Sequence, residues 1–83
     1  MKVTVKYFAS IREAIGRGSE LRETSAGTLA ALRDELLAAS PAHAGSLARG
    51  KSVRMALNQV MSDESAVLSE GCEVAFFPPV TGG

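Results

Sequence analysis

The chain has 83 residues, the size of one domain, and its nine basic and nine acidic side chains give a formal net charge of zero. This balance disfavours nucleic acid and anionic membrane as partners, because both select clustered positive charge. The one cysteine, Cys72, excludes an internal disulfide. With no apolar leader and no apolar run of about 20 residues, the sequence predicts a soluble, cytoplasmic protein.

The N-terminal half contains the two clearest secondary-structure signals. The alternation in KVTVKYF predicts a half-buried strand over residues 2–8. The segment 10–16 predicts a short helical turn, and 20–24 predicts a weak strand at a sheet edge. In 28–40, leucines at helical spacing follow Thr28, a residue type that suits the N-cap, so this segment predicts the main helix.

The C-terminal half predicts a loop and further strands. Residues 41–52 are mostly small and polar, which predicts a loop. Segments 53–59 and 72–77 alternate and predict strands, with a turn at 62–65 and a short strand at 66–68.

This order of elements predicts an α+β fold of the β-grasp (ubiquitin-like) type, a mixed sheet with one main helix packed across one face. A ferredoxin-like sheet is the alternative, but it needs two full helices. We expect residues 1–77 to form the body and 78–83 to form an extended tail.

Phe8 and Phe77 fall on the polar side of their strands, and Met61 lies at a turn without an evident buried position. Two large aromatic residues on the solvent side of neighbouring strands form an apolar patch that an isolated monomer does not need. We therefore expect the pair to bind a partner. The alternatives are a curled sheet edge that covers both rings, or a β-bulge that reverses the parity.

The stretch GSLARGKS at 45–52 fits the G-x-x-x-x-G-K-[ST] phosphate-loop pattern. A phosphate loop needs a strand before it and a helix after it, whereas here a helix precedes and a strand follows. We therefore expect a solvated basic loop. His43 is expected at the surface, and Cys72 is expected to be a half-buried, unreactive thiol. No residues in the body predict catalysis or a metal site.

The last segment leaves the domain. Prolines fix φ and cannot donate to a sheet, so pairing stops where they begin. The four residues after them reach about 13 Å, and the two glycines fit a narrow channel and leave the Gly83 carboxylate uncrowded. Adenylation would give that carboxylate a leaving group for a sulfur or an amine to displace. The tail residues are Pro78, Pro79, Val80, Thr81, Gly82 and Gly83.

The stretches KYFASIRE, LNQ and EVAFFPPVTGG make the whole chain similar to the small subunit of molybdopterin synthase, the sulfur carrier of molybdenum cofactor biosynthesis. The last stretch is specific, whereas the final GG is shared with the thiamine sulfur carrier and other ubiquitin-like proteins. Cys72 departs from the family, which commonly has an acidic residue after the turn glycine.

The resemblance implies that a ubiquitin-activating-like adenylyltransferase uses ATP to adenylate Gly83, and that a sulfur donor displaces AMP to leave a thiocarboxylate. The tail then enters the large subunit, which holds the catalytic lysines, and the sulfur attacks cyclic pyranopterin monophosphate to form the molybdopterin dithiolene. Phe8, Met61 and Phe77 match the family's partner contacts. The chain would bind no cofactor or metal itself, and two small subunits would flank a dimer of large ones.

Other functions fit the same tail. One is sulfur transfer in another pathway, to a thiazole or to tRNA. A second, of a different class, is a ubiquitin-like modifier, in which Gly83 forms an isopeptide bond with lysines of other proteins. A third is a binding module whose tail plays no part.

Overall fold

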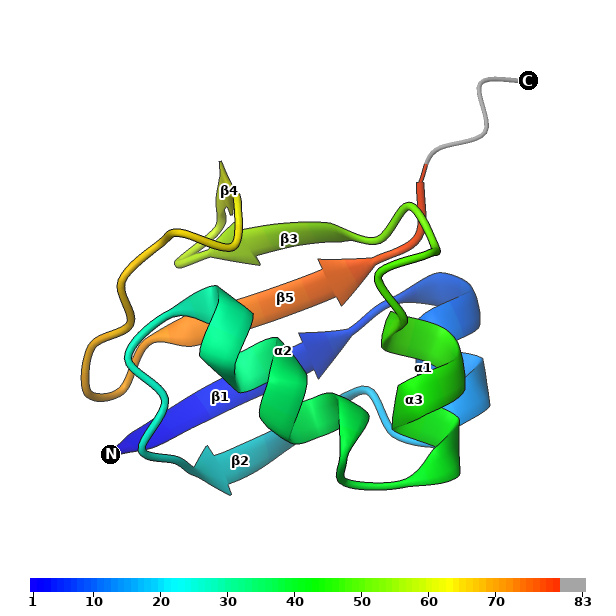
Figure 1. The fold of residues 1–83 in the computed structure, drawn as a ribbon, viewed down its shortest axis with the longest axis horizontal. Coiled ribbons are helices and arrows are strands. Elements are labelled where there is room, and N and C mark those ends of the chain that lie inside the picture. The colour runs from blue at the N-terminus through cyan, green and yellow to red at the C-terminus, as the bar shows by residue number, and fades with distance from the viewer. Residues whose placement is uncertain (80–83) are drawn as a thin grey trace.

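The structure, a computed structural model, describes residues 1–79, in which strands and helices follow one another as in Figure 1. The strands are β1 (Lys2–Tyr7), β2 (Ser19–Glu23), β3 (Arg54–Leu57), β4 (Val60–Ser62) and β5 (Glu73–Phe77). The helices are α1 (Ala9–Ile15), α2 (Leu29–Leu37) and α3 (Pro41–Leu47). Within the described residues, no helix has the length and apolar character needed to span a bilayer.

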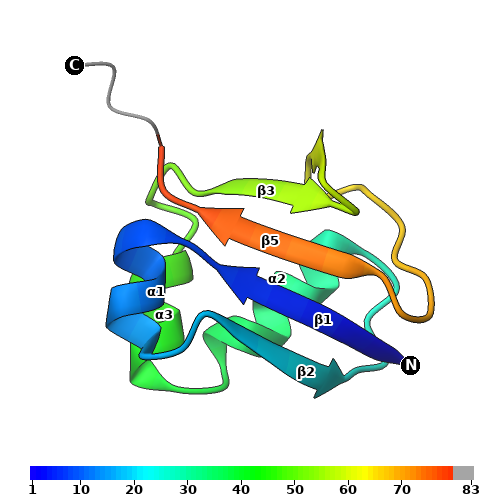
Figure 2. The same ribbon diagram turned by 180° about the vertical axis from the view of Figure 1, so that it is seen from behind.

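The strands form one mixed sheet in the order β2-β1-β5-β3-β4. The central strands β1 and β5 are parallel, and the other neighbouring strands are antiparallel. Figures 1 and 2 show α2 crossing one face, α3 on the same side, and α1 at the end where β1 leaves the sheet. This topology is the β-grasp, so the predicted fold class is confirmed and the ferredoxin-like alternative is wrong.

The core lies between α2 and the sheet, and the strand alternation decides which side chains enter it. Thr28 caps α2 as predicted, since its side chain accepts a hydrogen bond from the Ala31 N–H at 3.2 Å. Cys72 at the start of β5 is buried more fully than expected. The fully buried large side chains are Val3, Val5, Tyr7, Leu29, Leu32, Leu36, Leu47, Val74 and Phe76.

The prediction of a loop over 41–52 was wrong, because the first seven of these residues form α3. Ser40 is the N-cap of this helix, and Pro41 takes the first helical turn, where no N–H is needed. The Arg33 guanidinium of α2 is buried and donates from Nε to the Leu47 carbonyl oxygen at 2.8 Å. A proline that follows one helix therefore also starts the next.

The β3–β4 hairpin was also missed, and it places Met61 in a strand rather than at a turn. Asn58 and Gln59 connect the strands with φ of 50° and 68°, the left-handed pair of a type I′ turn. The Asn58 side-chain oxygen accepts from the Glu73 N–H at 2.9 Å, and the Asn58 N–H donates to the Glu73 carbonyl oxygen at 2.8 Å. The hairpin turn is thereby fixed to the beginning of β5.

Most element boundaries differ by one or more residues from the sequence prediction, and two of these differences concern the first strand and the segment 66–68. The first strand ends at Tyr7, and α1 begins at Ala9, so Phe8 is the N-cap residue of a helix. The predicted strand at 66–68 is only an isolated bridge from Val67 to the residue before α2.

A polar cluster on the inner side of α3 contradicts the prediction that His43 lies at the surface. Its Nε2 lies 3.4 Å from Glu20 Oε2, and its Nδ1 lies 2.7 Å from Ser40 Oγ. The buried Tyr7 hydroxyl donates to the same Glu20 oxygen at 3.0 Å, and the Tyr7 and His43 rings meet edge to face. A Ser40 hydroxyl that donates to Nδ1 leaves Nε2–H to donate to the carboxylate. The cluster thus joins β1, β2 and α3.

Burial by itself would raise the pKa of Glu20, but hydrogen bonds from Tyr7 and His43 and the charge of Arg22 lower it below the ordinary 4.5. A carboxyl with a lowered folded-state pKa stabilises the fold above its unfolded pKa, and this contribution is lost as pH falls through the folded value. We therefore expect Glu20→Gln to be less stable than the parent at pH 7, with a smaller further loss below pH 4.5. Urea unfolding at stepped pH measures both. Glu13→Gln, at an exposed position, serves as the control, and an unchanged acid slope for Glu20→Gln would contradict the role given to Glu20.

Candidate functional site

Strand pairing of the C-terminal segment ends with β5. The last paired residues are Phe76, opposite Tyr7 of β1, and Phe77, opposite Arg54 of β3. Pro78 and Pro79 follow and have no N–H to extend either ladder, so strand pairing ends here (Figure 1). The predicted tail positions Val80, Thr81, Gly82 and Gly83 lie outside the described residues.

Phe8 and Phe77 meet beside this exit, as their parity predicted. Because β1 and β5 are parallel, both strands end at the same edge, and the Phe8 N–H donates to the Phe76 carbonyl oxygen at 3.1 Å. The Phe8 and Phe77 rings lie 6.2 Å apart in an edge-to-face arrangement. Phe8 is 46% exposed, and Phe77 is half-buried.

Met61 lies on the same face of the sheet, on the edge strand β4. One strand, β3, separates β4 from β5. It pairs with Ala56 of β3, and Ala56 pairs with Ala75 of β5. Met61 is 56% exposed, while the two alanines are too small to rise above the side chains around them. We call Phe8, Met61 and Phe77 the outer patch, since they lie on the sheet face that α2 and α3 leave uncovered (Figure 2).

The backbone that presents Phe8 is strained. Ala9 has φ of 51°, a left-handed conformation that costs a non-glycine residue about 1–2 kcal/mol. The Ile11 and Arg12 N–H groups both donate to the Phe8 carbonyl oxygen, at 3.2 and 3.3 Å. This turn redirects the chain from β1 into α1 and leaves the Phe8 ring outside the core.

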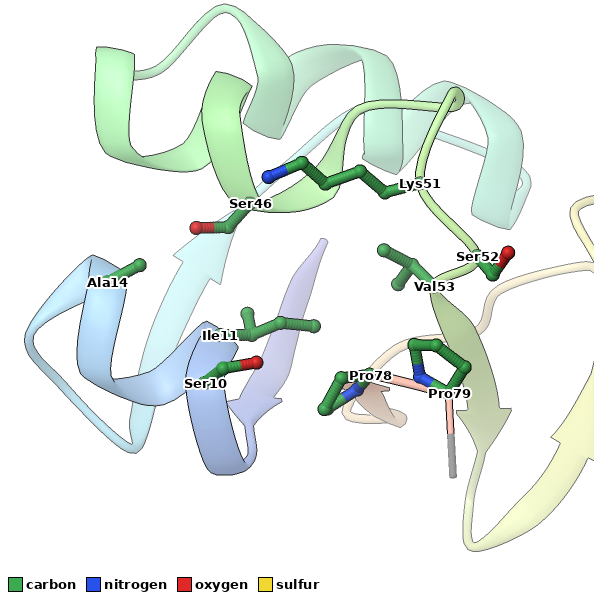
Figure 3. A pocket seen from close by; sticks show the side chains of 9 residues that line it. All are labelled: Ser10, Ile11, Ala14, Ser46, Lys51, Ser52, Val53, Pro78 and Pro79. Carbon is green, nitrogen blue, oxygen red and sulfur yellow. The ribbon is translucent and has the colours of Figure 1, made fainter. Parts of the chain in front are cut away.

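A groove of about 550 Å³ lies on the other side of the exit (Figure 3). Ile11 and Val53 form its apolar part beside Pro78, and the Lys51 side chain extends over Ser46 at its rim. The full lining is Ser10, Ile11, Ala14, Ser46, Lys51, Ser52, Val53, Pro78 and Pro79. The exit of the chain therefore lies between an exposed apolar patch and a groove with one cationic side chain.

Sequence reasoning did not predict this groove, because it depends on α3. The sequence segment that fits the phosphate-loop pattern, residues 45–52, does contribute to the groove, since Ser46, Lys51 and Ser52 all line it. The rejection itself agrees with the structure: Gly45 lies in α3, and the segment after Ser52 leads into β3. The order is helix then strand, the reverse of a phosphate loop.

The described residues supply little chemistry of their own near the exit. Over residues 1–79, no group of three or more His, Cys, Asp or Glu side chains is placed to hold a metal. His43 is engaged by Ser40 and Glu20, and Cys72 is buried at the opposite end of β5 from the exit. The geometry is suited to binding and presenting a chain end.

Comparison with known proteins identifies relatives over the full length. Residues 5–83 match the ThiS family. The chain is 40% identical to the molybdopterin synthase sulfur carrier subunit of Escherichia coli over 81 residues, which cover 98% of this chain and 99% of that protein.

Solved structures agree with the fold. SAMP1 from Haloferax volcanii superimposes with a TM-score of 0.80 at 24% identity over the whole of both chains, which supports the fold alone. A chain from the complex of subunits 1 and 2 of molybdopterin-converting factor from Helicobacter pylori matches with a TM-score of 0.73 and 26% identity, again over the whole of both chains. The chain therefore belongs to the ThiS family and is a homologue of the molybdopterin synthase sulfur carrier subunits, as its sequence motifs predicted.

Proposed function

We propose that this chain is the sulfur carrier subunit of molybdopterin synthase. The observation that carries the proposal is the 40% identity to a protein of that name, over 98% of this chain and 99% of the relative. Because the ThiS family match extends from residue 5 to residue 83, the proposal includes the C-terminal segment on which the chemistry depends.

The working atom in this proposal is the terminal carboxylate of Gly83. A carboxylate oxygen attacks the α-phosphorus of ATP on an adenylyltransferase of the ubiquitin-activating type, and pyrophosphate leaves. A sulfur donor then displaces AMP and leaves a C-terminal thiocarboxylate. Its sulfur attacks cyclic pyranopterin monophosphate, and two such transfers supply both sulfurs of the dithiolene. This chain binds no cofactor of its own, since the activating partner uses the ATP.

The body's geometry supports a presenting role. Pro78 and Pro79 direct the chain away from the sheet, and the outer patch and the groove offer binding surface on both sides of the exit. The large subunit supplies the catalytic groups, and the tail, residues 78–83, delivers the nucleophile. A tethered nucleophile gains from its high effective concentration in the partner's site.

The proposed synthase partner binds at the outer patch. The Helicobacter pylori relative was solved as a complex of subunits 1 and 2 of molybdopterin-converting factor, which supports a large-subunit partner here. We propose an assembly of two small and two large subunits, in which Phe8, Met61 and Phe77 contact the large subunit.

The thiocarboxylate is tested by intact mass. After incubation with the adenylyltransferase, ATP and a sulfur donor, we expect the mass to shift by the replacement of one oxygen with one sulfur. A chain that ends at Thr81 is the matched control and should show no shift, with its melting temperature unchanged. Lysine-linked conjugates in place of the shift would contradict a sulfur carrier and indicate a protein modifier.

The outer patch is tested with Phe77→Asp. The substitution removes the apolar contact of the Phe77 ring and puts a carboxylate, which is costly to desolvate, into the proposed interface. Binding to the large subunit should therefore weaken at least about 30-fold. Isothermal titration calorimetry measures the affinity. Val67→Asp, at a 73% exposed position outside the patch, should bind normally. A large fall in the melting temperature of Phe77→Asp would show that Phe77 belongs to the core, and the patch assignment would fail.

A further inference from the structure

The free edge of β2 has the pattern of a strand that pairs with another strand. β2 is the outermost strand on its side of the sheet, next to β1 alone (Figures 1 and 2). On either side of β2, the Gly18 carbonyl oxygen accepts from the Tyr7 N–H at 2.9 Å, and the Thr24 N–H donates to the Met1 carbonyl oxygen at 2.8 Å. Since these bonds alternate along an antiparallel pair, Ser19, Leu21 and Glu23 direct their N–H and C=O groups to the open side.

This edge carries charged side chains but lacks two other features that protect sheet edges. Its five residues contain no proline, and its register with β1 runs without a bulge. Leu21, at its centre, is 76% exposed on the outer face. The opposite edge, β4, has only three residues and offers a much shorter ladder. An exposed five-residue edge with a central leucine favours strand addition.

We propose that the partner for this edge is a second copy of the chain, paired antiparallel about a two-fold axis at Leu21. In that register Leu21 faces Leu21 of the second copy, and Ser19 faces Glu23. On the inner face, Glu20 of each chain then lies opposite Arg22 of the other. The strand is self-complementary in hydrogen bonding, in apolar contact and in charge.

The charges select this register over the neighbouring ones. A shift of two residues in one direction places Glu20 opposite Glu20, and a shift in the other places Arg22 opposite Arg22. Like charges directly opposite destabilise a strand pair, whereas opposite charges stabilise it. A shift of one residue would place Leu21 of the second copy opposite an inner-face residue of the first. The pleats of the two strands would then not match, which excludes this register.

Arg22 has an unused donor at this position. Its Nη1 lies 3.5 Å from Glu20 of its own chain, and its Nε lies 3.8 Å from the Glu35 carboxylate. Among the described residues this Nε is buried and has no hydrogen-bond partner within the chain. A Glu20 carboxylate from a second copy would add a negative charge opposite this guanidinium, whose own contacts with Glu20 and Glu35 are long.

One strand pair buries less surface than the roughly 1,200–2,000 Å² of a stable interface, so the dimer is weak and depends on concentration. Its two sheets join into one ten-stranded sheet, and both chain exits, which belong to β5, stay free. The inference does not depend on the proposed function.

The first experiment compares Leu21→Asp with Val67→Asp by sedimentation velocity of the full chain at rising concentration. The two positions are 76% and 73% exposed, and only Leu21 lies on β2. The parent and Val67→Asp should dimerise, and Leu21→Asp should raise the dissociation constant at least about tenfold, because two carboxylates meet at the axis. A parent chain that stays monomeric throughout would overturn the proposal and leave this edge to a strand of another protein.

The second experiment tests the register with single cysteines. A mixture of Ser19→Cys and Glu23→Cys chains should form a mixed disulfide, because opposite hydrogen-bonded residues have Cα atoms about 5.5 Å apart. Each variant alone should not cross-link, since its two copies lie about 13 Å apart along the strands. The parent is the control, because its one cysteine, Cys72, is buried. Cross-linking of Ser19→Cys alone at the rate of the mixture would contradict the register.

Discussion

The parallel pairing of β1 with β5 is the constraint on which the rest of the structure depends. It aligns Thr4 with Glu73 and Tyr7 with Phe76, so the first and last strands finish at the same edge of the sheet. The Phe8–Phe77 contact, the turn into α1 and the exit at Pro78 all lie there as a consequence. An antiparallel pairing would place the exit beside the N-terminus, far from Phe8. The positions of Pro78, the outer patch and the groove therefore all depend on the direction of these two strands.

Most of this arrangement was predictable because one face of each strand is buried, which makes apolar and polar residues alternate along the sequence. Alternation in the first and last strands separated Tyr7 and Phe76, which stack in the core with ring centres 6.3 Å apart, from Phe8 and Phe77 on the outer face. A one-residue error in either strand would have reversed the assignment. The proline pair likewise marked the end of β5 correctly, because a missing N–H has the same consequence in any sheet.

The groove and the inner polar cluster were not predictable from local patterns. The sequence predicts a helix that ends at Ser40 and a loop that begins at Pro41, but these two residues are the N-cap and the first turn of α3. α3 has a single large apolar residue, Leu47, so its sequence contains no helical periodicity from which the helix could be predicted. His43 is partly buried by contacts with Tyr7 of β1 and Glu20 of β2, which are far away in sequence. These features depend on tertiary contacts that no short stretch contains.

The central claim is that the terminal carboxylate is the reacting group and that the folded body presents it. The most direct measurement is the rate of sulfur transfer to the pterin substrate by a chain extended with a few uncleavable residues after Gly83. The account predicts complete loss of transfer with an unchanged melting temperature and near-normal binding at the outer patch. Transfer at the parent rate would contradict the account, because the extended chain no longer has its carboxylate on Gly83.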